Sequence, residues 1–232
     1  ALEEAGANYI DVARSDKKNT DNREAILAIL QDDNLEKPPF APPFLSDNGL
    51  IISQAAAILQ YLAPKINLIG TDPKERGFAH QIQLTISDLI SEAHDTHHPI
   101  SSALFYEDQI EESKRRAVYF TKLRIPKYLT YFEKILTKNH GNSEWLIGDK
   151  LTYPDLSLFQ IVEGLKYAFP KVFSKLSDDY VKVMALRDAV SVRPNIAAYL
   201  ASTRRIEFNT MGVFRFYPEL DEVSLYDYKV RI

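Results

Sequence analysis

One segment of the chain, residues 155–169, carries apolar side chains on nearly every face of the helix that its spacing predicts. A surface helix keeps a polar face toward water, so a helix that is apolar all round has to be enclosed by other elements. The apolar positions are Leu156, Leu158, Phe159, Ile161, Val162 and Leu165. We therefore expect this segment to be the buried central helix of its half of the chain.

The residues just before this helix form an N-terminal capping signal, Thr152-Tyr153-Pro154-Asp155. The threonine hydroxyl of such a box accepts a bond from an early helical N–H, and the carboxylate three residues on bonds back to the cap. Pro154 falls in the first turn, where a missing N–H costs nothing. We predict a structural role: Thr152→Ala and Asp155→Ala each lower the free energy of unfolding by about 1–2 kcal/mol without altering ligand affinity.

Helical periodicity also marks the segments around this helix. Apolar residues recur every three to four positions from residue 73 to residue 98, and Pro99 is expected to end that helix. The other predicted helices are residues 111–136, interrupted by Pro126, residues 177–190 and residues 194–201. The aromatic-rich residues 214–232 are expected to be irregular. Residues 73–232 therefore form an all-helical domain.

The first 66 residues have a different pattern. Their predicted elements are an extended segment at 8–12, helices at 21–31 and 54–62, and a hairpin with strands at 44–45 and 50–52. Asp47-Asn48-Gly49 between the two apolar runs is the hairpin signal. Residues 37–43 hold four prolines, which excludes both a helix and a central strand there. We expect an α+β fold, with a smaller domain at 1–66 before the helical domain.

Composition excludes several classes of protein. The 232 residues contain no cysteine, so neither a disulfide framework nor a thiolate-ligated metal is available within them. The formal net charge is −4 with both signs interspersed, which argues against a nucleic-acid or membrane-surface partner. No apolar run approaches the roughly 18 residues that a membrane span needs. We expect a cytoplasmic protein.

Three local strings, taken with the order of the elements, resemble cytosolic glutathione transferases, nearest to the mu and sigma classes. The strings are residues 43–45 (PFL) with Gln54 eleven residues on, residues 145–155 (WLIGDKLTYPD) and residues 196–200 (IAAYL). The second is the most specific, because it introduces the buried helix in that family. The resemblance covers about residues 1–216. It implies a thioredoxin-like domain that binds glutathione, followed by an all-helical domain that forms the floor of a site for hydrophobic electrophiles.

The resemblance also implies a glutathione site. Pro43 matches a cis proline, and Pro42 matches the residue before it, whose backbone bonds glutathione; a proline there lacks the N–H. Gln54 matches a glutamine or glutamate, but Ala55 stands where a serine usually holds the γ-glutamyl carboxylate. We expect the helix N-terminus to bind that carboxylate instead. Asp88 matches an aspartate that reaches the glutathione amine across a dimer, with a solvated helix carboxylate as the alternative.

The catalytic residue is expected before Ala1. Residues 1–6 resemble the end of a helix, and in the family a first strand and helix carry the tyrosine, serine or cysteine that activates the thiol. Three functions follow from the resemblance: a transferase that adds the glutathione thiolate to hydrophobic electrophiles, a catalytically silent binding protein, and a glutathione-dependent thiol reductase. Pro42 and Ala55 motivate the second, and the third requires a cysteine in the preceding segment.

A group of histidines closes the first long predicted helix. His94, His97 and His98 share a helix face, which suggests either a metal site or imidazoles placed against the helix dipole. We expect no metal, because no further ligands can be placed. The resemblance implies instead that His94, His98 and Phe214 line the substrate pocket, although an aromatic tail also packs as core.

The family resemblance implies a homodimer as well. Phe40 lies in the proline-rich segment, close to the position of an aromatic residue that inserts between helices of the partner subunit. An aromatic ring in an exposed loop needs an apolar site in which to be buried. Packing of Phe40 within its own subunit is the alternative.

Overall fold

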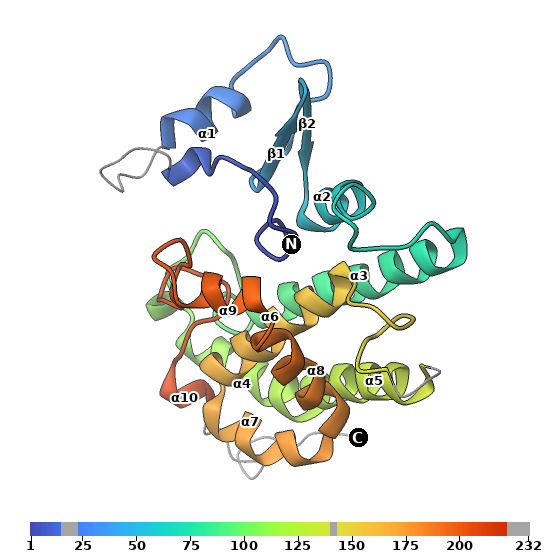
Figure 1. Ribbon diagram of the computed structural model, residues 1–232. Coiled ribbons are helices and arrows are strands. Elements are labelled where there is room, and N and C mark those ends of the chain that lie inside the picture. The colour runs from blue at the N-terminus through green and yellow to red at the C-terminus, as the bar shows by residue number, and fades with distance from the viewer. Residues whose placement is uncertain (15–22, 140–142, 222–232) are drawn as a thin grey trace.

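The computed structural model describes residues 1–14, 23–139 and 143–221. Its N-terminal part contains a 3₁₀ turn at Val12–Arg14, α1 (Arg23–Leu30), β1 (Phe44–Asp47), β2 (Leu50–Ser53) and α2 (Ala55–Leu62). Its C-terminal part contains α3 (Pro73–His94), α4 (Ile110–Tyr119), α5 (Ile125–Lys138), α6 (Tyr153–Ala168), α7 (Pro170–Leu176), α8 (Val181–Ser191), α9 (Pro194–Leu200) and α10 (Pro218–Asp221). Shorter turns lie at Tyr106–Asp108, Phe120–Arg124 and Ser177–Asp179. Figure 1 shows the small α+β part beside the helical part.

The predicted hairpin is confirmed. β1 and β2 pair antiparallel, with Asp47 opposite Leu50 and Phe44 opposite Ser53. Asn48 and Gly49 have φ angles of 50° and 84°, the left-handed pair that a tight two-residue hairpin turn requires. The extended segment expected at 8–12 is not a strand, because no described segment other than this hairpin forms a β-ladder. Residues 12–14 form a 3₁₀ turn instead.

The expected central helix is confirmed as α6. Its buried residues come from every face, and α3 and α8 make its main contacts (Figure 1). Asp155 is 0 % exposed and accepts three hydrogen bonds, from Leu146 N at 2.8 Å, Thr152 N at 2.6 Å and the Thr152 hydroxyl at 2.7 Å. The capping box is therefore present, and its carboxylate also holds the loop that leads into α6.

Two of the other helices differ by more than two residues from their predicted limits. α3 ends at His94 rather than His98, and a looser helical turn follows, in which the Thr96 hydroxyl donates to the Ala93 carbonyl at 2.7 Å. The helix predicted at 177–190 is α8, which begins at Val181 and follows an unpredicted α7. The interruption predicted at Pro126 is confirmed: a π-helical turn at Phe120–Arg124 ends directly before α5, and Pro126, which has no N–H, lies in the first turn of α5.

The two parts of the chain are joined by polar contacts as well as by the linker. The Tyr153 N–H at the start of α6 donates to the Leu68 carbonyl at 3.0 Å. Glu4, in the N-terminal turn, forms an ion pair with Arg193, and the Asn195 amide donates to the Glu4 carbonyl at 2.9 Å. The N-terminal part is thereby held against the starts of α6 and α9. None of the described helices has the length and hydropathy of a membrane span.

Candidate functional site

The open end of the hairpin brings together the residues predicted to bind glutathione. Phe44 and Ser53 are the last pair of the ladder, so Pro43 and Gln54 follow directly beyond it on neighbouring strands. The peptide bond between Pro42 and Pro43 is cis, as predicted. Pro42, Pro43, Gln54 and Ala55 are all exposed. The structure therefore places four of the predicted site residues at one accessible end of the sheet.

The start of α2 supplies unpaired donors at the same place. Gln54 is the N-cap residue, and no side chain among the described residues caps the helix. The first bond that closes the helix runs from Ile58 N to Gln54 O at 2.9 Å, so the N–H groups of residues 55–57 have no acceptor within the helix. Such a helix start attracts an anion through these donors and through its dipole. Ala55 is the first residue of this helix, and its side chain has no hydroxyl that could bind an anion together with the N–H groups.

Gln54 also has an unusual backbone. Its φ angle of 69° lies in the left-handed region, which a residue with a side chain adopts rarely. The conformation turns the chain from β2 directly into α2 and leaves the Gln54 side chain exposed. A strained residue of this kind persists where the surrounding structure requires it, often at a binding site. The amide of Gln54 offers both a donor and an acceptor to a bound molecule.

Asp88 lies apart from these residues. It is on the exposed face of α3, and within the part of the chain that the structure describes it shares no hydrogen bond with residues 42–55. Within one chain it is a solvated helix carboxylate.

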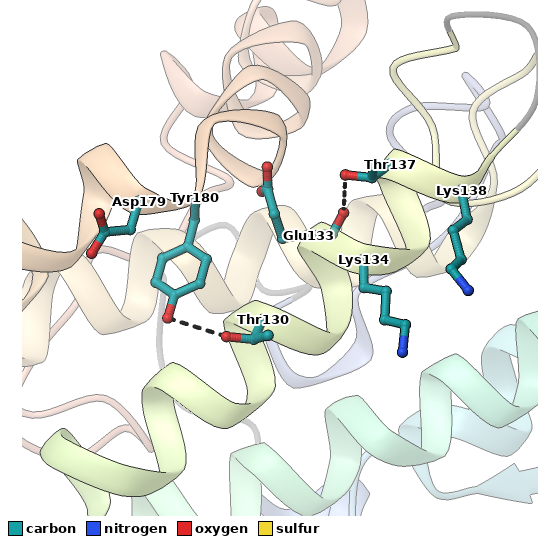
Figure 2. Close-up of a pocket in the computed structure, with 7 residues that line it drawn as sticks. All are labelled: Thr130, Glu133, Lys134, Thr137, Lys138, Asp179 and Tyr180. Atoms are coloured by element: carbon teal, nitrogen blue, oxygen red, sulfur yellow. Dashed lines mark hydrogen bonds between the residues drawn. The ribbon is translucent and has the colours of Figure 1, made fainter.

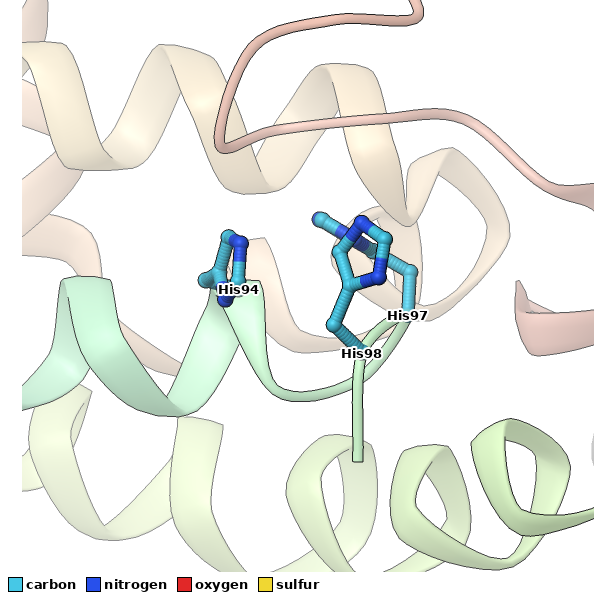
Figure 3. Close-up of side chains that lie close together, drawn as sticks. All are labelled: His94, His97 and His98. Carbon is cyan, nitrogen blue, oxygen red and sulfur yellow. The ribbon is translucent and has the colours of Figure 1, made fainter. Parts of the chain in front are cut away.

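The three histidines lie together at the C-terminal end of α3 (Figure 3). Ring centroids are 5.1 Å apart for His94 and His97, 5.0 Å for His94 and His98, and 4.8 Å for His97 and His98. Burial lowers the pKa of His97 to about 4 and also lowers the pKa of His98. The His97 ring is therefore neutral at pH 7.

Phe214, which was expected to line the substrate pocket, is buried rather than open to solvent. It is 7 % exposed and packs in the core. Its ring covers Gly164 in α6 so closely that a Cβ atom on Gly164 would lie 2.4 Å from the Phe214 Cδ2 atom. The glycine leaves the space that the ring fills. The alternative that aromatic residues near the C-terminus pack as core is correct for Phe214.

A pocket of about 430 Å³ lined by polar and charged residues lies between α5 and the start of α8 (Figure 2). Its side chains already hold the fold together. Glu133 accepts hydrogen bonds from Lys182 N at 3.0 Å and Val183 N at 2.9 Å, and thus caps α8. The Tyr180 and Thr130 hydroxyls lie 3.3 Å apart. We interpret this pocket as a structural junction rather than a binding site.

A second groove, of about 580 Å³, lies between α3 and α5 and was not predicted from the sequence. Phe78 of α3 and Tyr131 and Ile135 of α5 supply its apolar lining. Phe78 is exposed although it continues the apolar stripe of α3. Phe78, an apolar residue of a predicted helix that stays exposed in the described structure, was the available signal for this groove.

Comparisons with known proteins agree with this architecture. Residues 94–203 match the family described as Glutathione S-transferase, C-terminal domain. A glutathione S-transferase of Plasmodium falciparum is 26 % identical over 201 residues, which cover 84 % of this chain and 87 % of that protein. Glutathione S-transferase A of Cavia porcellus is 30 % identical over 176 residues, 74 % of this chain and 72 % of that protein. The crystal structure of a monomeric glutathione S-transferase from the hookworm Necator americanus superposes with a TM-score of 0.64 at 20 % identity, covering 89 % of this chain and 90 % of that one.

Proposed function

The chain belongs to the glutathione S-transferase family, and on that premise we propose that it binds glutathione at the open end of the hairpin and conjugates it to hydrophobic electrophiles. The observation that carries the proposal is the position of Pro43 and Gln54 beside the uncapped start of α2. Glutathione is an extended peptide with carboxylates at both ends. Such a ligand pairs with an exposed backbone edge and binds an anion-binding helix start.

In this arrangement the Pro42 carbonyl accepts a hydrogen bond from the cysteinyl N–H of glutathione. Pro42 has no N–H, so the reciprocal bond is absent, at a cost on the order of 1 kcal/mol. The γ-glutamyl carboxylate lies at the N–H groups that begin α2, and the Gln54 amide contacts the same end of the ligand. The Asp88 carboxylate of a second subunit binds the glutathione amine.

The chemical step needs the thiolate rather than the thiol. A free thiol with a pKa of about 8.5 is mostly protonated at neutral pH, so a nearby donor has to stabilise the anion. The sulfur then attacks an electrophilic carbon, forms a carbon–sulfur bond and expels a leaving group with its electron pair. We assign none of these 232 residues to that role. His94 and His98 are the residues of the chain proposed to face the electrophile.

Two substitutions test how glutathione is held. Ala55→Ser adds a hydroxyl beside the proposed carboxylate and is expected to tighten binding by about 1 kcal/mol, a factor of about five. Gln54→Ala is expected to weaken binding, because the amide contacts are lost. Isothermal titration calorimetry with reduced glutathione measures both effects. Ala198→Ser, the same change on an exposed position of α9, is the control and should leave the affinity unchanged.

A negative result has a definite meaning. If the wild-type chain gives no heat with millimolar glutathione while its far-ultraviolet circular dichroism shows a folded protein, the transferase proposal fails. The silent binding protein, which Pro42 and Ala55 favour, then becomes the better interpretation.

We also propose a homodimer in which Phe40 enters the α3–α5 groove of the second subunit. Phe40 is 89 % exposed, so its ring is not buried within its own chain. The groove offers apolar side chains from both helices. An aromatic ring in a closed apolar pocket is a common hot spot of an interface.

Phe40→Ala is therefore expected to raise the dimer dissociation constant at least about tenfold. Analytical ultracentrifugation over a concentration series measures this constant. Phe105→Ala is a matched control, because Phe105 is also exposed but lies on another loop. The Necator americanus protein shows that this fold also exists as a monomer. A wild-type chain that sediments as a monomer at micromolar concentration would contradict the proposal.

A further inference from the structure

The histidine cluster has features that substrate contact does not explain. Each of His94, His97 and His98 offers one ring nitrogen, and these three atoms lie within 4.8 Å of one another. The chain beyond α3 keeps a helical turn, since both His97 N and His98 N bond to the His94 carbonyl at 3.2 Å. This turn holds the three rings together (Figure 3). All three histidines thus lie within residues 94–98, at the C-terminal end of α3.

His97 is the most informative member. Its side chain is buried, with the residue 1 % exposed, and its Nε2 atom lies 2.8 Å from the Val213 carbonyl. A carbonyl only accepts, so Nε2 carries the proton and Nδ1 carries a lone pair. The Nδ1 atom is buried and has no hydrogen-bond partner among the described residues. A buried polar atom of this kind is costly unless something binds it.

The other two rings are also held from outside the cluster. Nδ1 of His94 lies 3.6 Å from the Asp95 carboxylate. Nδ1 of His98 accepts a hydrogen bond from the Gln109 amide N–H, with the two nitrogens 3.1 Å apart, because the Gln109 carbonyl oxygen accepts from Ile100 N instead. The His98 ring therefore has to turn away from the Gln109 amide before it can bind an ion. Imidazoles that bind metals usually donate their second ring N–H to a carboxylate, a backbone carbonyl or water, which fixes the ring orientation. His97 with the Val213 carbonyl follows the same pattern.

We propose that His94, His97 and His98 bind a transition-metal ion of the zinc type, with one coordination position left for water or another small ligand. Bonds of about 2.1 Å to a tetrahedral Zn²⁺ place the nitrogens about 3.4 Å apart. Rotation of the partly exposed His94 and His98 rings closes the triangle around the buried Nδ1 of His97. This site departs from the expectation, based on the sequence, that no metal is bound.

The surrounding charges favour a particular class of ion. Arg215 is close enough to lower the pKa values of His97 and His98, after the larger effect of burial, so it also repels a cation. Asp95 faces His94 but lies 3.9 Å from Arg116, and Glu92 is bound by Arg124. Carboxylates thus contribute little negative charge. An ion that bonds strongly to neutral imidazole, such as Zn²⁺, Ni²⁺ or Cu²⁺, suits this site, whereas Mg²⁺ and Ca²⁺ do not.

The test is calorimetric titration of the tag-free, metal-stripped chain with Zn²⁺, in the absence of glutathione because a thiol also binds zinc. His94→Ala and His98→Ala remove partly exposed ligands. His80→Ala, which removes a histidine in the middle of α3, is the matched control. Circular dichroism verifies that each variant is folded. Cu²⁺ electron paramagnetic resonance provides a second measurement, because coupling to three nitrogens identifies the ligands directly.

We expect one Zn²⁺ per chain, no binding of Mg²⁺, and an affinity for Zn²⁺ at least about tenfold weaker in His94→Ala and in His98→Ala. The control should bind Zn²⁺ like the wild type. Absence of Zn²⁺ binding at millimolar concentration would overturn the proposal. An equal loss of Zn²⁺ affinity in His80→Ala and in the two cluster variants would also overturn it, since the ion would then be bound elsewhere. Neither result bears on glutathione binding, which is measured separately.

Discussion

Asp155→Ala is expected to lower the free energy of unfolding by about 3 kcal/mol, more than a capping residue alone contributes. The structure explains the larger effect. The carboxylate is wholly buried and accepts hydrogen bonds from the backbone N–H groups of Leu146 and Thr152, which are buried too. Removal of the carboxylate leaves two buried donors unpaired, and each costs about 1–3 kcal/mol.

Chemical denaturation at pH 8 measures this effect. Burial raises the pKa of Asp155 to about 6, so the carboxylate is ionised at that pH. Thr152→Ala should cost only about 1 kcal/mol, because the other two bonds to the carboxylate remain. Asp149→Ala, in the same loop but exposed, is the control and should change stability by less than about 0.5 kcal/mol. A loss for Asp155→Ala no larger than that of the control would show that the capping box is not structural.

The features of this fold that the sequence predicted are those that depend on nearby residues. The hairpin turn at Asn48 and Gly49 follows from the preference of these two residues for positive φ. The start of α6 follows from a cap that lies within four residues of chain. In both cases the atoms that determine the conformation are neighbours in the sequence.

The limits of α7 and α8 depend instead on distant carboxylates. The first N–H groups of α7 are bound by Asp221, with Lys171 N at 2.8 Å and Val172 N at 3.0 Å. Those of α8 are bound by Glu133. Each cap comes from about 50 residues away in the chain, so the local sequence contains no signal for it. This explains why one helix was missed and the other was given the wrong first residue.

The candidate sites divide in the same way. Pro43 and Gln54 could be placed together because the hairpin register between them is short and local. The sequence showed that His94, His97 and His98 share a helix face, but it could not show that Val213, more than a hundred residues away, accepts the Nε2 proton of His97. The contact of Phe214 with Gly164 on α6 could not be predicted from the sequence either, because the two residues are brought together only by the packing of the folded chain.

Gly164→Ala is the second substitution with a large expected effect. An alanine Cβ would lie 2.4–2.5 Å from three atoms of the Phe214 ring, a distance at which something has to shift. The ring is buried and also packs edge-on against Phe208, so a shift of the ring disturbs a second contact. Overpacking of a core costs about 1–3 kcal/mol and sometimes more. We expect a loss near the upper end of that range, about 3 kcal/mol.

Gly77→Ala provides the matched comparison. Gly77 is also inside a helix, α3, but in the described part of the chain no atom beyond its own helix backbone lies within 4 Å of the position that a Cβ atom would take. Alanine is the better helix former by about 1 kcal/mol, so this variant should be more stable than the wild type. Opposite signs for the same substitution in two helices would isolate the contact with Phe214. If both variants gain stability, the ring does not fill the space above Gly164.

A double substitution tests whether the new methyl group and the ring compete for one volume. Phe214→Leu alone should destabilise the core, because a smaller side chain leaves a cavity. In the background of Gly164→Ala, the same change frees the space that the methyl group needs, so its cost should be smaller by at least about 1 kcal/mol. Thermal and chemical unfolding of the four proteins gives this coupling energy. Strictly additive losses would mean that residues 164 and 214 do not interfere, and that α6 is held against the C-terminal segment by other contacts.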